Sequence, residues 1–517
     1  MDATTRVVSR RRGLRITEIV IIGVVTVVLV SVDLMFYFWP FRYREVHPLL
    51  QQVFQSRVDV KSYHRTYFPH PGFVAEDVTF YRHGDTHIPP LATVKKMTVA
   101  GQWLRLIFHP HTLYQIRLEG LHVQIPPPGT TARGMDLDNG VISTSDSKLR
   151  IQTILADGTT LDFLRHQGAP LRFVFKALVI HNVQDKRPLE FAIRVNTLEP
   201  PGTVVAMGTL GPFRTNSYGT TQMSGSYSLV DGDLNGLDGM WGHPAAGGRF
   251  GGMFSKMDVK GNAAIPDFRV ASGQTVRVDA AYHVTVSGTN GDVEIENAIV
   301  KSGGSLITAS GSVAGSPKKV AVTIETKNSQ VRDLLKIVEQ ASPQVEGAVS
   351  FRAAVNFGEE PGRFLEKLNL KGDVSLDEMR LVKPQMQQKV DAFSARVRKD
   401  APGGVKSGGD PPEINLAARG ETRFNHGVAY FPAIFASVPG AQAHLHGTFN
   451  LLDTRIHLTG TVALEKDIAH AVTGWKSVLL KPLSPFFKKK DAGAVVPIAV
   501  TGTAKNPRVG ADLLHDK

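Results

Sequence analysis

The chain has 517 residues, of which 42% are hydrophobic and 21% charged, so it can bury a substantial core and form more than one domain. It contains no cysteine, which excludes a disulfide scaffold and any cysteine-ligated metal site. The formal net charge of +12 invites a nucleic-acid interpretation, but there is no zinc finger, RNA-binding aromatic motif or basic helix. We therefore expect no nucleic-acid partner.

An apolar run near the N-terminus predicts a membrane anchor. Residues 19–39 are almost entirely apolar, and about twenty such residues span a bilayer as a helix. Because five arginines precede the run and only two follow it closely, the positive-inside rule places the N-terminus in the cytoplasm. We expect a basic cytoplasmic tail at 1–15, a transmembrane signal anchor at 16–39, and the rest of the chain outside.

Two features of the anchor need their own interpretation. Asp33 is explained either by a span that begins near Ile16, which brings the carboxylate close to the headgroups, or by a docking contact with a membrane partner. Tyr37, Phe38 and Trp39 are expected to form an aromatic belt at the membrane interface.

Beyond the anchor, apolar and polar residues alternate along most of the chain, which is the pattern of half-buried strands. In the stretch 115–125, QIRLEGLHVQI, a bulge at Gly120 would place Leu118 and Leu121 on one face. Comparable strands are predicted to begin near Ala92, Gly291, Lys318, Thr454 and Val495. The sequence thus predicts a mainly β protein.

Few helices are expected after the anchor. Short helices are predicted at His47–Gln55, Val331–Gln340 and Asp467–Leu480. Glycine- and proline-rich segments are expected to break the strands near 126–140, 236–252 and 401–412, the last as a flexible loop. These breaks divide the expected β region into sections at 40–235, 236–400 and 413–517.

One short unit recurs: glycine, any residue, apolar, any residue, apolar. A glycine at the start of a strand permits a bend or a bulge, so each unit predicts a strand entered through a bend. The irregular spacing excludes a fixed-period solenoid and favours a long antiparallel meander. The units begin at Gly225, Gly291, Gly347, Gly372, Gly447 and Gly460.

Catalytic and metal-binding motifs are missing from the sequence, so we expect no enzyme activity and no cofactor. There is no nucleophile elbow, phosphate loop or zinc helix. The segment that begins at Asp231 starts like a calcium loop but has Gly242 at the twelfth position, so we interpret it as a turn. The glycine-rich segment 242–252 lacks a strand–helix frame, and we interpret it as a flexible turn.

Two histidine pairs are possible metal ligands. Each pair supplies two ligands, but no third ligand is identifiable, so surface histidines are the preferred interpretation. The pairs are His109 with His111, and His444 with His446.

The order of these elements resembles AsmA-like proteins, which are related to bridge-like lipid transfer proteins. The resemblance rests on HPLLQQVFQSRVDV after the anchor, on FGGMFSKMDVKGNAAIPDFRV in the middle and on GVAYFPAIFASVPGAQAHLHGTFNLLD near the end. It implies a single anchor in the bacterial inner membrane and an elongated, curled, mostly antiparallel sheet in the periplasm, groove-like with an apolar inner face. It further implies a role in phospholipid transport or outer-membrane biogenesis.

Three functional classes remain: a carrier or conduit for phospholipid acyl chains, a non-enzymatic scaffold for outer-membrane protein assembly that works with a membrane protein partner, and an envelope enzyme. The one-sided strands favour the first class, although the same residues would face each other in a closed sandwich. The candidates for the floor of a lipid groove are Val293, Ile295, Val322, Ile324, Val374, Leu376, Ile456 and Leu458.

The segment Asp467–Lys490 is the candidate for membrane contact. Aromatic residues next to a lysine run suit an anionic headgroup layer, whereas the alternative is a helix that plugs one end of the sheet. The candidates are Trp475, Phe486, Phe487, Lys488, Lys489 and Lys490.

Overall fold

The computed structural model describes residues 24–30, 39, 41–54, 57–81, 90–103, 112–125, 150–164, 170–183, 187–198, 201–211, 219–235, 237, 239–270, 273–315, 318–338, 345–357, 362–381, 416–438, 441–464, 495–503 and 506–511. The chain divides into two compact units. Unit 1 comprises residues 1–124, 129–159 and 181–185, and unit 2 comprises residues 125–128, 160–180 and 186–517.

Unit 1 is a small sheet with one helix. Its elements are α2 (Tyr43–Phe54), β1 (Val58–Thr66), β2 (Gly72–Phe80), β3 (Ala92–Ala100), β4 (Thr112–Glu119), β5 (His122–Ile125) and the first part of β6 (Arg150–Phe163). Strands β1 to β4 pair antiparallel in chain order, and β4 pairs in parallel with β6. The predicted amphipathic helix is confirmed and begins four residues earlier, at Tyr43.

The core of unit 1 contains fully buried side chains. Val58, Ala75 and Val78 have no exposed surface, and Trp39 packs among them with 2% of its surface exposed. Trp39 was expected in an interfacial belt, but its ring lies 5.4 Å from that of Trp103, so the structure places it in a protein core.

Gly120 acts much as the sequence suggested. It adopts a φ of +65°, β4 ends before it, and β5 resumes two residues later on the same neighbour, β3. Leu118 and Leu121 consequently both pack against the core of unit 1. The feature at Gly120 is an interruption between two strands and not a β-bulge within one strand.

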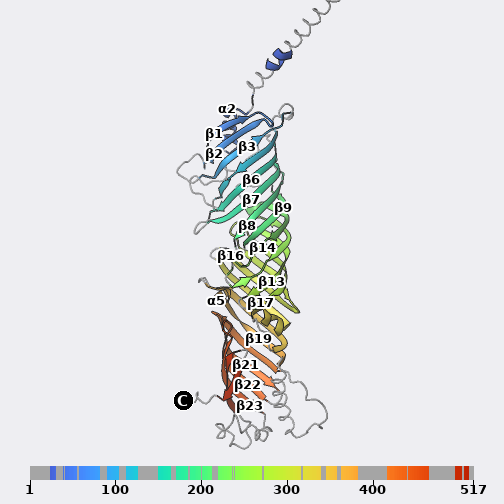
Figure 1. Cartoon of the computed structure of the whole chain (residues 1–517), viewed down its shortest axis with the longest axis vertical. Coiled ribbons are helices and arrows are strands. Elements are labelled where there is room, and N and C mark those ends of the chain that lie inside the picture. Colours follow the sequence, from blue (N-terminus) through green and yellow to red (C-terminus); the bar gives the residue numbers. More distant parts are fainter. Residues whose placement is uncertain are drawn as a thin grey trace, which may run out of the picture. The chain divides into compact units, whose positions relative to one another are not determined.

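Unit 2 is a long antiparallel meander in which the strands follow one another in chain order, except that β10 pairs directly with β12 and the short β11 pairs with β13 (Figure 1). Its first strands are β7 (Leu171–Val183, shared with unit 1), β8 (Leu189–Leu198), β9 (Pro201–Leu210), β10 (Gln222–Val230), β11 (Met240–Trp241), β12 (Ala245–Met253), β13 (Lys256–Val270), β14 (Val276–Val286), β15 (Val293–Ser302) and β16 (Ser305–Gly315). The later elements are β17 (Lys318–Gln330), α4 (Val331–Val338), β18 (Val345–Phe357), α5 (Phe364–Lys367), β19 (Leu368–Leu381), β20 (Leu416–Asn425), β21 (Val428–Val438), β22 (Ala441–Asn450), β23 (Arg455–Leu464), β24 (Val495–Thr503) and β25 (Asn506–Ala511).

The strands predicted near Ala92, Gly291, Lys318, Thr454 and Val495 and the helix that begins at Val331 are confirmed. The glycine-rich segment 242–252 was misassigned: most of it is strand β12, paired with β10 and β13. The recurring units were also partly misread, since Gly225, Gly372, Gly447 and Gly460 lie inside strands rather than at their starts.

Residues 24–30 are helical and highly exposed. Among the described residues, no helix is both long and apolar enough to cross a membrane.

Candidate functional site: the apolar face of unit 2

The register of unit 2 aligns apolar residues from strand to strand. Directly paired residues in neighbouring strands point to the same face of a sheet. Following the pairs from β8 to β25 gives one unbroken row in which every residue is apolar or glycine. The row consists of Phe191, Gly208, Gly225, Phe250, Val259, Val284, Ile295, Gly311, Val322, Val355, Leu370, Phe424, Ala429, Phe449, Ile456, Gly502 and Pro507. We call this side of unit 2 the apolar face.

All the groove candidates lie on this face. Ile295, Val322 and Ile456 belong to the row itself, and Val293, Ile324 and Leu458 are two residues from a row member in their strands. Val374 pairs with Phe351 and Gly420, and Leu376 pairs with Val349 and Ala418. Side chains predicted from alternation alone are therefore brought onto one continuous surface.

The burial of these candidates is intermediate for every one of them. In strands such as β13 and β15, half-buried residues alternate with exposed ones, whereas the core of unit 1 contains residues with no exposed surface. Two sheets packed face to face would bury such residues fully. Along most of its length the apolar face is thus only partly covered.

The opposite face carries the charges. Asp258 accepts hydrogen bonds from His283 and Lys260, which hold the pKa of its carboxyl below the usual range. Arg277 holds Asp279 in a two-pronged ion pair of 2.7 and 2.8 Å. Because these pairs are exposed and screened by water, they contribute little to stability. The charges keep this face in water and distinguish it from the apolar face.

Two tyrosines interrupt the apolar face with polar atoms. The hydroxyl oxygens of Tyr227 (β10) and Tyr282 (β14) lie 2.6 Å apart, although two strands separate them. The positions between them are Gly248 and Gly261, and a Cβ at Gly261 would lie 2.6 Å from Tyr227 Oη and 2.8 Å from Tyr282 Oη. Glycine is required here because the phenol groups and the backbone carbonyls of Lys260 and Gly247 occupy the space of a side chain. Burial raises the pKa of Tyr227, and the hydrogen bond to Tyr282 adds to the shift.

This glycine requirement explains why β12 was misassigned as a turn. The tyrosine pair was not identified from the sequence either, although Tyr227 occupies an apolar position in the unit that begins at Gly225, which is a usable signal.

At one level the apolar face is fully covered. Val270 (β13), Leu365 (α5), Phe424 (β20) and Ala429 (β21) form a buried cluster with exposures of 3 to 6%. In this cluster β13 packs against β20 and β21, which are not hydrogen-bonded to it in the sheet. The sheet of unit 2 must therefore curl around the cluster. No signal in the sequence marked Leu365, which lies in a segment too short to show a period.

The turn and the histidines on the polar face behave as expected. Asp233 accepts a hydrogen bond of 2.8 Å from the backbone of Asn235, as in an Asx turn. His444 and His446 are exposed; His444 stacks on Phe435 with ring centres 4.5 Å apart, and His446 bonds Thr459. Within the described part of the chain, no group of three or more potential ligands is placed to hold a metal ion.

Several candidates lie outside the described residues. These are His109 and His111, the loop at 401–412, the helix predicted at Asp467–Leu480, the membrane-contact residues Trp475, Phe486, Phe487, Lys488, Lys489 and Lys490, and most of the predicted anchor at 16–39.

Comparison of the chain with known protein families, with curated proteins and with solved structures gave no match.

Proposed function

We propose that the apolar face of unit 2 binds the acyl chains of phospholipids. The observation that carries the proposal is the uninterrupted row of apolar residues and glycines, most of whose described members outside the cluster around Leu365 are half-buried. An exposed apolar strip of this length is an unfavourable surface in water unless a ligand covers it.

The energetics suit a carrier. Burying a methylene is worth roughly 0.8 kcal/mol, so a sixteen-carbon chain exposed to water costs on the order of 12 kcal/mol. An acyl chain that leaves a bilayer for an apolar face avoids most of this cost. The process needs an unbroken apolar surface and no catalytic group, so we propose a binding protein and not an enzyme.

The cellular role is part of the same proposal. A bacterial inner-membrane anchor at 16–39 would hold the rest of the chain in the periplasm, where an AsmA-like protein would contribute to phospholipid transport and outer-membrane biogenesis. The basic residues before the apolar run support this orientation.

A scaffold for outer-membrane protein assembly is the second candidate. On the otherwise charged face, a hollow of about 500 Å³ is lined mainly by alanines, with Ile299 40% and Leu306 53% exposed beside it. Apolar side chains exposed in this way suit a protein contact.

Native mass spectrometry of the detergent-extracted full chain separates the two functions. We expect bound phospholipid on the natural protein and its loss in Val374→Glu, because a carboxylate on the apolar face repels an acyl chain. The control is Ala354→Glu on the charged face, opposite Lys371, which should keep the lipid. Lipid-free protein with a stoichiometric protein partner would support the scaffold instead, and unfolding of Val374→Glu together with the absence of lipid would contradict the groove.

A further inference from the structure

Two opposite edges of the unit 2 sheet meet at the apolar face. In an antiparallel meander, successive connections alternate between the two edges, so the β10–β12 and β18–β19 connections belong to opposite edges. Yet Gly239 of the first connection lies against α5 of the second: a Cβ on Gly239 would be 3.7 Å from Arg363 Cβ. The sheet therefore curls far enough to close over its own apolar face at this level.

The closure leaves no open strip beneath it. Leu365 of α5 is 6% exposed and packs in the same cluster as Phe424 (5%) and Ala429 (6%), which are members of the apolar row. Row members before and after this level, such as Val322 and Ile456, are half-buried. An acyl chain that follows the row consequently meets the side chain of Leu365.

The edge opposite α5 is firmly attached. Met240 and Trp241 pair with Val270 and Arg269, and the Arg269 guanidinium lies 4.6 Å from the centre of the Trp241 ring. The carboxylate of Asp267 accepts hydrogen bonds of 2.8 and 2.6 Å from the backbone N–H and Nδ1 of His243.

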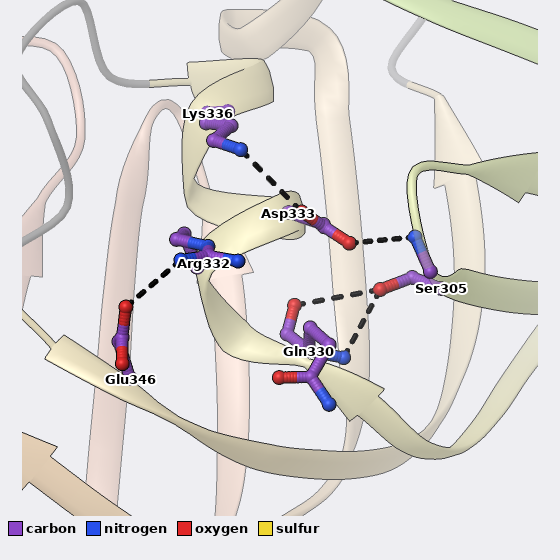
Figure 2. A network of polar contacts seen from close by, with 7 residues as sticks. Ser305, Gln330, Arg332, Asp333, Lys336 and Glu346 are labelled. Carbon is purple, nitrogen blue, oxygen red and sulfur yellow. Dashed lines mark hydrogen bonds and ion pairs between the residues drawn. The ribbon is translucent and has the colours of Figure 1, made fainter.

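Helix α4, on the same edge, is also fixed by polar contacts (Figure 2). Asp333 accepts a hydrogen bond of 2.8 Å from the backbone of Gly304, and Arg332 donates one of 2.9 Å to Glu346. Ile337 of this helix packs against the buried cluster.

Helix α5 is held differently. Its hydrogen bonds among the described residues are local, such as the 2.9 Å bond from Arg363 N–H to Glu366 and the 3.3 Å bond from Asn369 to Lys367. Four residues long, it is secured across the face chiefly by apolar packing of Phe364 and Leu365. Among the described residues, α5 can therefore move away from the opposite edge without breaking a strand ladder or an ion pair.

We propose that α5 is a gate: with Leu365 seated on Phe424 and Ala429 it divides the apolar face into two bays, and it must swing away before an acyl chain can pass from one bay to the other. This regulation rests on the proposed acyl-chain binding and adds to it. Val284 lies in the bay before the gate, and Leu458 lies in the bay after it.

A disulfide across the gate tests the proposal. Disulfides have Cβ–Cβ distances of about 3.5–4.5 Å, which matches the 3.7 Å at Gly239 and Arg363, and the natural chain has no cysteine to interfere. Because Gly239 has a φ of +84°, a cysteine there is strained in both redox states, so the reduced double variant is the reference for the oxidised one. The double variant Gly239→Cys/Arg363→Cys is prepared in the full chain, with a photo-crosslinking residue in place of Val284 or Leu458. It is then incubated with phospholipid vesicles, from which it can take up lipid. The control is Arg352→Cys/Asp373→Cys, a directly paired couple on the charged face that does not cross the apolar face.

Oxidation should lower lipid capture at Leu458 at least tenfold and leave capture at Val284 unchanged, and a reductant should restore Leu458. The control pair should show no redox effect. Equal capture at Leu458 in both redox states, or capture at Val284 with none at Leu458 in either state, would overturn the gate while leaving lipid binding intact. Failure to capture lipid at Val284 in the reduced protein would overturn the proposed function as well. Leu365→Ser weakens the apolar packing of α5 on Phe424 and Ala429 without any crosslink. This variant should raise lipid capture at Leu458 relative to the natural chain.

Discussion

Among single residues, Tyr227 and Tyr282 place a hydrogen bond on the apolar face. Burial raises the pKa of Tyr227, so the folded protein keeps this phenol protonated at a pH where the unfolded chain has lost the proton. A raised folded-state pKa contributes stability that is fully present below the ordinary value of 10.0 and is lost as the pH rises above it.

We therefore expect the free energy of unfolding to fall above about pH 10, and Tyr227→Phe to remove part of this fall. At neutral pH the same variant should be about 0.5–1.5 kcal/mol less stable, because the hydroxyl of Tyr282 loses its partner. Denaturant titrations at several pH values measure both effects. Tyr63→Phe, in unit 1, serves for comparison: burial also raises the pKa of Tyr63, so this variant should reduce the alkaline loss of stability in the same way. An unchanged alkaline dependence in Tyr227→Phe would contradict the assignment.

Glycines inside strands allow the close approach of neighbouring backbones. Gly447 has a φ of +145°, and a Cβ there would lie 2.1 Å from the carbonyl oxygen of His457. Gly447→Ala should destabilise unit 2 by more than about 1 kcal/mol, because the conflict is with backbone that cannot rotate away. Gly510→Ala, with no atom within 4 Å of its Cβ, should change the midpoint of denaturation very little. Similar midpoints for the two variants would show that the strands tolerate a side chain at Gly447.

At the level of helices and strands, the alternation of apolar and polar residues predicted those elements that depend on local sequence. The periodicity of apolar residues and the positions of glycine and proline predict the strands near Lys318 and Val495 and the helix at Val331. The same alternation places Ile295, Val322 and Ile456 on one face of their strands. The glycines of β12 misled the prediction because glycine favours turns on its own, whereas here space is taken by Tyr227 and by the backbone of β13.

The gate could not be predicted from a local pattern. Leu365 shares a buried cluster with Val270 because the connection that contains Gly239 meets the one that contains Arg363, and these residues are far apart in the sequence. Register and curvature decide such a contact, and neither is readable from a four-residue helix. The covering of Trp39 in unit 1 has the same origin, since its partners Tyr67 and Trp103 come from other segments.

The packing of α5 gives a direct stability prediction. Leu365→Ala should cost roughly 2–5 kcal/mol, because the side chain is 6% exposed and leaves a cavity in the cluster. Leu306→Ala removes the same atoms from a side chain that is 53% exposed and should cost about 0.5 kcal/mol or less. Chemical denaturation of both variants measures the difference, and equal small losses would mean that α5 does not seat on the apolar face in solution.

For the protein as a whole, the predicted anchor would determine where the proposed lipid function takes place. The arginines before residues 19–39 predict that the chain crosses the membrane once, with its N-terminus in the cytoplasm. An alkaline phosphatase fused after Lys517 should be active, and a fluorescent protein that matures only in the cytoplasm should stay dark there. The reverse pattern would place unit 2 in the cytoplasm and remove the periplasmic role.

Acyl-chain binding by the apolar face of unit 2 is best tested by site-specific photo-crosslinking in living cells. A crosslinker replaces Val322 or Ile456 on the apolar face and, as matched controls one residue away on the opposite face, Thr323 or His457. We expect phospholipid adducts by mass spectrometry at Val322 and Ile456 and none at Thr323 and His457. Adducts at neither pair, or equally at both, in protein that remains folded would contradict acyl-chain binding by this face.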